Sequence, residues 1–263
     1  MPAWLSYPLE FWLLADLAVV LIGASKAGFG SGVGVVATPL VALALPVADA
    51  VALLLPLLLV GDLFAVRHYR RSYDRASLRL LLPSAAVGIV LGSLFFDLFS
   101  EQERVLKIGI GVISLLFVLY QVTGGALSRA LGRRPPNRTL GVAFGAVAGF
   151  TSTVAHVGGP PLTMYLLAQN LSRRIFVGTS AWFFLIVNAL KLIPFTILGL
   201  LVARNLLVVA ILLPLVYLGI RLGLVLVRVV NERSFNLVVY ALLTLTAVQL
   251  LLGRSLISLL VRG

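Results

Sequence analysis

The sequence contains no cysteine, only two histidines and few charged residues. The absence of cysteine excludes disulfides, iron–sulfur clusters and thiolate metal sites, and two histidines are too few for a histidine-rich metal centre. Charged residues make up 11% of the 263 residues and hydrophobic ones 60%, with a mean hydropathy of +1.10. This composition lies far outside that of soluble domains. It predicts an all-α polytopic membrane protein in a lipid bilayer, with no metal and no cofactor.

Apolar segments of near-membrane length recur along the chain, and about eight spans of about 20 residues would fit, since each must cross roughly 30 Å of hydrocarbon. The segments fall near residues 9–24, 33–45, 48–66, 78–96, 105–123, 139–152, 160–169, 175–198, 205–227 and 235–252. A basic, proline-containing stretch separates the first five from the last five. We therefore expect a first repeat at 1–127, a cytoplasmic linker at 128–138 and a second repeat at 139–263.

Basic residues outnumber acidic ones by 21 to 9, and the net charge is +12. They gather in short loops, as the positive-inside rule expects of cytoplasmic loops, so the charge indicates orientation and no nucleic-acid partner. Five arginines follow the third segment, whereas Arg204 is alone at the corresponding point of the second half. Equivalent loops then lie on opposite faces, which predicts inverted repeats. The N-terminus has no basic n-region and no small-residue cleavage site, so no removed signal peptide is expected.

Two glycine-rich interruptions, at 25–34 and 149–161, lie inside apolar sequence near the start of each half. In a membrane, backbone breaks at depth occur only where protein shields them or where they line a watery cavity. The interruptions predict the tips of two oppositely facing broken-helix hairpins that meet near mid-membrane, each hairpin followed by three transmembrane helices. A pair of full tilted spans is the alternative for each.

The residues of these interruptions resemble a known family. Ser-Lys-Ala-Gly-Phe-Gly-x-Gly begins at Ser25 and is followed by Pro39. Gly-Phe-x-Ser-x-x-x-His-x-Gly-Gly-Pro begins at Gly149, with Gly-Thr-Ser-Ala later at 178–181. The pattern resembles the sulfite exporter TauE/SafE family of membrane permeases over essentially the whole chain. The resemblance implies a non-enzymatic secondary transporter of the bacterial inner membrane. It would move a small sulfur-containing or organic anion, such as sulfite, a sulfonate or sulfoacetate, by alternating access with an ion gradient.

Two lysines favour an anionic substrate. Lys26 lies beside the first interruption and Lys191 lies within a long apolar segment. A lysine in hydrocarbon costs roughly 2.5–3.5 kcal/mol on insertion scales, so each should face a cavity or a partner. The alternatives are a salt bridge or loop position for Lys26 and snorkelling to the outer interface for Lys191.

The interruptions offer further ligand groups, because a half-helix N-terminus that begins with proline presents unpaired N–H groups and a positive dipole end to an anion. Glycines would let the backbone approach the ligand, and hydroxyls would donate hydrogen bonds. The expected substrate-binding residues are Lys26, Gly30, Ser31, Gly32, Gly34, Pro39, Ser152, Thr153, His156, Gly158, Gly159, Pro160 and Lys191. Close helix packing is the alternative for the glycines, and we prefer packing for Gly141 and Gly145.

A titratable group in the membrane points to proton coupling. His156 and Asp62 are the candidates. For His156 the alternative is a neutral histidine bonded to a backbone carbonyl. For Asp62 the alternatives are pairing with a basic residue and an interfacial position near Arg67. Asn188 falls at a place in the second repeat similar to that of Asp62, and Trp182 and its neighbour are expected to serve packing.

Other function classes are less well supported. No catalytic dyad is found, because pairing Ser152 with His156 as a protease would need a regular helix through the second interruption. An anion channel would share the helices and the polar breaks, and a non-transport assembly protein is a further alternative. The sequence leaves the oligomeric state open, with an oligomer as one option.

Overall fold

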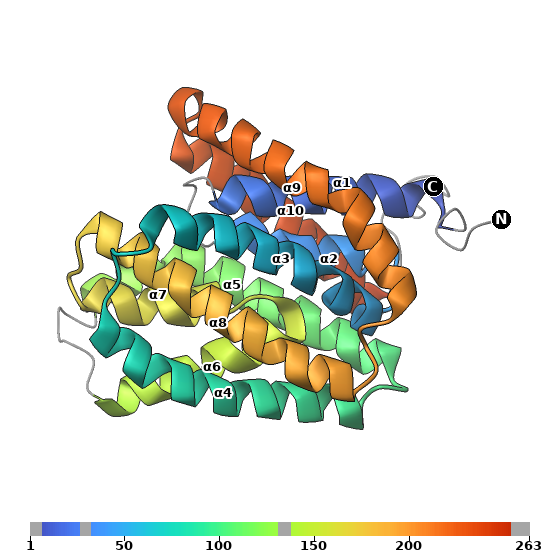
Figure 1. The fold of residues 1–263 in the computed structure, drawn as a ribbon, viewed down its shortest axis with the longest axis horizontal. Helices are drawn as coiled ribbons and strands as arrows, with labels where there is room; N and C mark the ends of the chain where they lie inside the picture. The colour runs from blue at the N-terminus through green and yellow to red at the C-terminus, as the bar shows by residue number, and fades with distance from the viewer. Residues whose placement is uncertain (1–6, 27–32, 131–137, 254–263) are drawn as a thin grey trace.

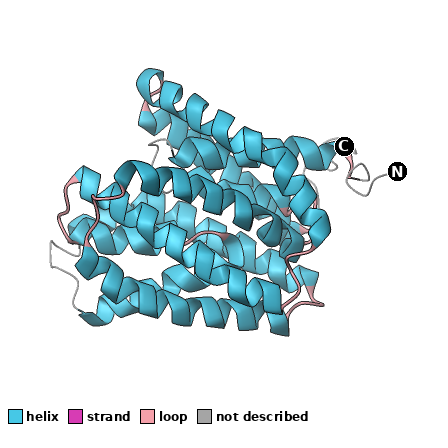
Figure 2. Cartoon of the chain, in the orientation of Figure 1, coloured by secondary structure: helices cyan, strands magenta, loops and turns pink. Residues whose placement is uncertain are grey.

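The computed structural model describes residues 7–26, 33–130 and 138–253, and within these it contains helices and no strands (Figure 2). The elements are α1 (Leu9–Ala24), the 3-10 helix η3 (Val33–Val36), α2 (Ala37–Val41), α3 (Val47–Tyr69), α4 (Arg75–Leu98), α5 (Glu103–Ala130), α6 (Arg138–Ala155), α7 (Gly159–Ala168), α8 (Arg173–Ile197), α9 (Ala203–Val229) and α10 (Glu232–Leu252). The all-α prediction is confirmed. Each predicted apolar segment corresponds to one of these helices, except that 33–45 is divided between η3 and α2. Residues 131–137 of the predicted linker lie outside the described part.

Six described helices are long and apolar enough to cross a membrane: α3, α4, α5, α8, α9 and α10. The expectation of about eight spans was therefore too high. The two hairpins account for the difference, because α1 has 16 residues, α7 has 10, and α6 has 18 including a first-turn arginine. Large apolar side chains such as Leu94, Leu119 and Leu237 are exposed on the outer faces, as contact with lipid requires.

Small residues let the hairpins lie close to long helices. A Cβ added at Gly88 of α4, or at Gly145 or Gly149 of α6, would collide with the backbone of the facing helix. Gly23 and Gly219 bring α1 and α9 together in the same way. Small residues at helix contacts are the usual device for close packing in membranes. The packing prediction for Gly145 is confirmed, and it holds for Gly141, whose added Cβ would meet side chains of α4 and α7.

Equivalent helices of the two halves make equivalent contacts with the opposite half or with the hairpins. The α4 helix packs along α6, and its counterpart α9 packs along α1; likewise α4 contacts α8 and α9 contacts α3. The equivalent pairs α3 with α8 and α5 with α10 contact each other directly. In Figure 1, α3 and α8 lie side by side and run in opposite directions. This is the pattern that inverted repeats would produce, and the repeat relation itself stays a prediction.

Candidate functional site

The second break is shorter than predicted. Helix α6 continues past Gly149 to Ala155, and only residues 156–158 separate it from α7. His156 has a φ of 55°, in the left-handed region, and its N–H donates to the Ser152 carbonyl at 3.1 Å. A left-handed residue after the last helical turn is a common way to end a helix. The break is therefore centred on His156, while Gly149 belongs to the packed contact with α4.

The first break follows α1. Residues 27–32 lie outside the described part of the chain, and with them the predicted ligands Gly30, Ser31 and Gly32. The described flanks are Lys26 on one side and η3, which includes Gly34, on the other.

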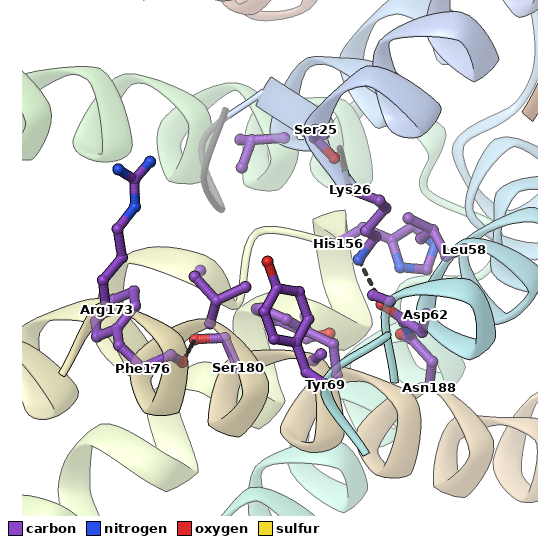
Figure 3. A pocket seen from close by; sticks show the side chains of 18 residues that line it. Ser25, Lys26, Leu58, Asp62, Tyr69, His156, Arg173, Phe176, Ser180 and Asn188 are labelled. Carbon is purple, nitrogen blue, oxygen red and sulfur yellow. Dashed lines mark hydrogen bonds and ion pairs between the residues drawn. The ribbon is translucent and has the colours of Figure 1, made fainter. Parts of the chain in front are cut away.

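Both breaks contribute to one cavity of about 320 Å³, shown in Figure 3. Lys26, Asp62 and Asn188 form its polar end. At the other end it reaches Tyr69, the last residue of α3, and the exposed Arg173, the first residue of α8. The lining residues that the first break supplies are Ser25, Lys26, Gly34 and Val35, and those of the second are Ser152, His156 and Gly159. The remaining polar lining comes mainly from α3 and α8.

Lys26 forms an ion pair with Asp62 of α3 at the polar end (Figure 3). The Asp62 side chain is completely buried, and its second carboxylate oxygen accepts a hydrogen bond from Asn188 Nδ2 at 2.6 Å. The Lys26 side chain keeps 17% of its surface exposed and lies over the Phe184 ring, 5.3 Å from its centroid. The salt bridge expected as an alternative for Lys26 is confirmed, and the Asp62 carboxylate faces Lys26 and Asn188 inside the helix bundle.

Lys191 is completely buried behind the cavity wall. Its Nζ lies 2.9 Å from the Ser152 carbonyl oxygen, 3.1 Å from Ser152 Oγ and 2.8 Å from His156 Nδ1. Three acceptors thus match the three N–H donors of an ammonium group. Snorkelling to the interface is wrong, because the helix face that carries Lys191 is turned toward the second break.

The two partners of the His156 ring determine its tautomer. Nε2 lies 2.9 Å from the Val51 carbonyl oxygen, which can only accept, so Nε2 carries the hydrogen. Nδ1 then accepts from Lys191. This geometry is that of a neutral histidine bonded to a backbone carbonyl, which was the alternative to a proton carrier. His156 therefore orients Lys191.

A family model for sulfite exporter TauE/SafE matches residues 16–250, which include every element from α2 to α9. The chain belongs to the sulfite exporter TauE/SafE family. No curated protein and no solved structure shows a match. The family consists of membrane transporters. The six long apolar helices among the described residues make this TauE/SafE chain a multi-pass membrane protein.

Other predicted ligands of this TauE/SafE protein lie away from the cavity. Thr153 is buried against α4, and its Oγ1 donates to the Gly149 carbonyl at 2.9 Å. Pro39 is buried within α2, which has only five residues and therefore offers little helix dipole. Gly158 and Pro160 are also buried outside the lining.

The N-terminus of α7 reaches the cavity through Gly159. Pro160 and Pro161 follow it and have no N–H, so two of the four groups that a helix start normally leaves unpaired are missing. Of the two residues that keep an N–H at this helix start, Gly158 and Gly159, only Gly159 lines the cavity.

Sequence reasoning missed several lining residues, including Tyr69, Arg173, Phe176, Ser180 and Phe184. Ser180 lies within the Gly-Thr-Ser-Ala motif, the one sequence signal that could have found it. Trp182 and Phe183 lie outside the lining, and Trp182 packs 5.6 Å from the Tyr73 ring, as the packing prediction expects. Among the described residues no group of three or more His, Cys, Asp or Glu could hold a metal ion.

Proposed function

We propose that this TauE/SafE protein is a secondary transporter for a small sulfur-containing or organic anion, of the sulfite, sulfonate or sulfoacetate type, and that the cavity is its binding site. One observation carries the proposal: residues of both breaks line a single cavity beside two lysines, whereas Asp62 is its one carboxylate among the described residues. An ammonium-rich site that is shielded from lipid favours an anion.

The polar end supplies groups that recognise a sulfur oxyanion. The Lys26 ammonium faces the cavity, and Ser152 Oγ accepts from Lys191, so the serine hydroxyl hydrogen is left to point at a ligand. The volume of about 320 Å³ lies at the small end of ligand pockets, which span roughly 300–1,000 Å³. These features fit a compact anion better than a sugar or a peptide.

The end of the cavity at Tyr69 and Arg173 fits an entrance for anions. Arg173 lines it, and Arg67, Arg70, Arg71 and Arg174 are exposed on the adjoining helix ends and loop. Clustered positive charge raises the local concentration of an anion. By the positive-inside rule this end is cytoplasmic. We therefore propose that the structure is the inward-open state of an alternating-access cycle driven by an ion gradient.

A thermal-shift panel on the purified protein tests the substrate class. Sulfite, thiosulfate, sulfonates and carboxylates are compared with amines and neutral sugars, and at least one anion should raise the Tm in a concentration-dependent way. The increase should be lost in Lys26→Gln and kept in the control Lys107→Gln, whose lysine pairs with Glu103 on α5. Stabilisation by amines or sugars and by no anion would overturn the proposal.

A further inference from the structure

We propose that the substrate anion opens the Lys26–Asp62 ion pair and that Asp62 then takes up one proton, so that anion and proton are bound together one to one. This inference rests on the proposed function and names its coupling ion and the residue that carries it. It chooses between the two candidates for proton coupling.

The Lys26–Asp62 ion pair lies where a substrate anion can take the place of the carboxylate. An anion in the cavity meets a Lys26 ammonium whose charge Asp62 already balances. If the anion took Lys26 while Asp62 stayed ionised, a fully buried carboxylate would be left without a cation, which is strongly unfavourable. A proton on Asp62 removes that charge. The lysine stem packs directly on Gly61 of α3, where an added Cβ would lie 3.3 Å from Lys26 Cγ.

Asn188 suits both states of Asp62. It now donates from Nδ2 to the carboxylate at 2.6 Å. With its amide rotated by half a turn, Oδ1 would accept from the O–H of a protonated Asp62. A leucine at this position could hydrogen-bond to neither state and a lysine, a donor only, to the ionised state alone, whereas an amide can partner both.

The other groups that face Asp62 are poor proton acceptors. Lys26 and Lys191 are donors, and Arg173 with Tyr69 lies at the far end of the cavity. His156 cannot gain a proton at Nδ1 without turning a second donor toward Lys191.

Among the described residues, the Asp62 carboxylate has hydrogen-bond or ion-pair contacts only with Lys26 and Asn188. On α9, Tyr217 contacts Phe64, and on α5, Glu103 accepts from the Val47 N–H at the opposite end of α3. Asp62 is therefore the carboxylate that exchanges its partner.

The charges balance. The anion replaces the carboxylate at Lys26, and one O–H bond forms on Asp62 with a proton from hydronium or a buffer acid on the open side, which loses its own bond to that proton. No other covalent bond changes. For a monovalent anion the net charge of the site is the same before and after binding.

The test is the number of protons taken up on anion binding, measured by titration calorimetry on the full chain in buffers of different ionisation enthalpy. The probes are methanesulfonate, sulfoacetate and thiosulfate, whose sulfonate or thiosulfate groups stay ionised near neutral pH. We expect about one proton per anion, and affinity that falls about tenfold per pH unit as pH rises, since one linked proton gives that slope.

Asp62→Asn mimics the protonated residue. We expect it to bind the probe with no proton uptake and no pH dependence, while Asp97→Asn on the exposed end of α4 behaves as wild type. His156→Gln should bind more weakly with the proton count unchanged. Binding by wild type without proton uptake, or uptake that persists in Asp62→Asn, would overturn the inference alone. If none of the probes and none of the thermal-shift anions bind, the proposed function fails first.

Discussion

Lys26 and Lys191 lie on opposite sides of the same cavity wall and are held in different ways. Lys26 is partly exposed and bound to one carboxylate, Asp62. Lys191 is completely buried and bound only to neutral acceptors, those of Ser152 and His156. An ion pair at a cavity wall can be exchanged for a ligand, whereas a fully hydrogen-bonded buried ammonium is fixed in place. The first break therefore holds the exchangeable charge and the second the permanent one.

The largest effect is expected from breaking the exchangeable pair. Lys26→Met would leave the buried Asp62 carboxylate without a cation, which typically costs about 3–5 kcal/mol. Thermal unfolding in detergent should show this loss together with the absence of anion binding. The double variant Lys26→Met/Asp62→Asn should recover most of the stability but not the binding. A single variant as stable as wild type would contradict the role of the pair.

A smaller effect is expected at the permanent charge. Lys191→Met would leave His156 Nδ1 and the Ser152 groups without their donor, a loss of about 1–3 kcal/mol for unsatisfied buried groups. Anion affinity should fall because the cavity loses a nearby positive charge, while the proton count stays at one. The matched control is Lys107→Met on α5, whose side chain is partly exposed and pairs with Glu103, because a solvent-exposed pair contributes about 0–1 kcal/mol. Equal effects of the two substitutions would remove the distinction between the sites.

A steric change should perturb Lys26 without touching its charge. A Cβ at Gly61 would lie 3.3 Å from Lys26 Cγ, so Gly61→Ala should force the lysine off its rotamer. Anion affinity should drop about 2–10-fold, the equivalent of about 0.5–1.5 kcal/mol of rotamer strain. Gly109→Ala is the control, since its Cβ would meet Phe95 at the same 3.3 Å far from the cavity. Calorimetry on both variants shows whether the effect is specific to the site.

The smallest effect is expected at the entrance. Arg173→Gln should slow anion uptake about twofold at low ionic strength, because the mouth loses one steering charge. The difference should vanish at high salt, where exposed charges are screened. Arg79→Gln, which changes an exposed arginine of α4 outside this cavity, should leave uptake unchanged. Initial rates in proteoliposomes at two salt concentrations measure both.

Hydrophobic segments predicted the helices well, because each membrane span requires a long apolar run. The site was harder to predict. Lys26 and Asp62 are 36 residues apart, and no spacing rule relates them. Lys191 was open to two interpretations because the apolar sequence around it does not show which face of α8 meets the second break. Sequence reasoning named both His156 and Asp62 as candidates for proton coupling. We now propose Asp62, because the His156 ring is bonded to the Val51 carbonyl and to Lys191.

Counterflow in proteoliposomes tests most directly whether the cavity serves a carrier. Vesicles are loaded with the unlabelled anion that stabilises the protein most, and entry of the same labelled anion is followed over a range of concentrations. A carrier predicts saturable entry that is accelerated by the anion inside, and Asp62→Asn should retain this exchange while losing uptake driven by a proton gradient. Entry that rises linearly with concentration and ignores the anion inside would contradict the account.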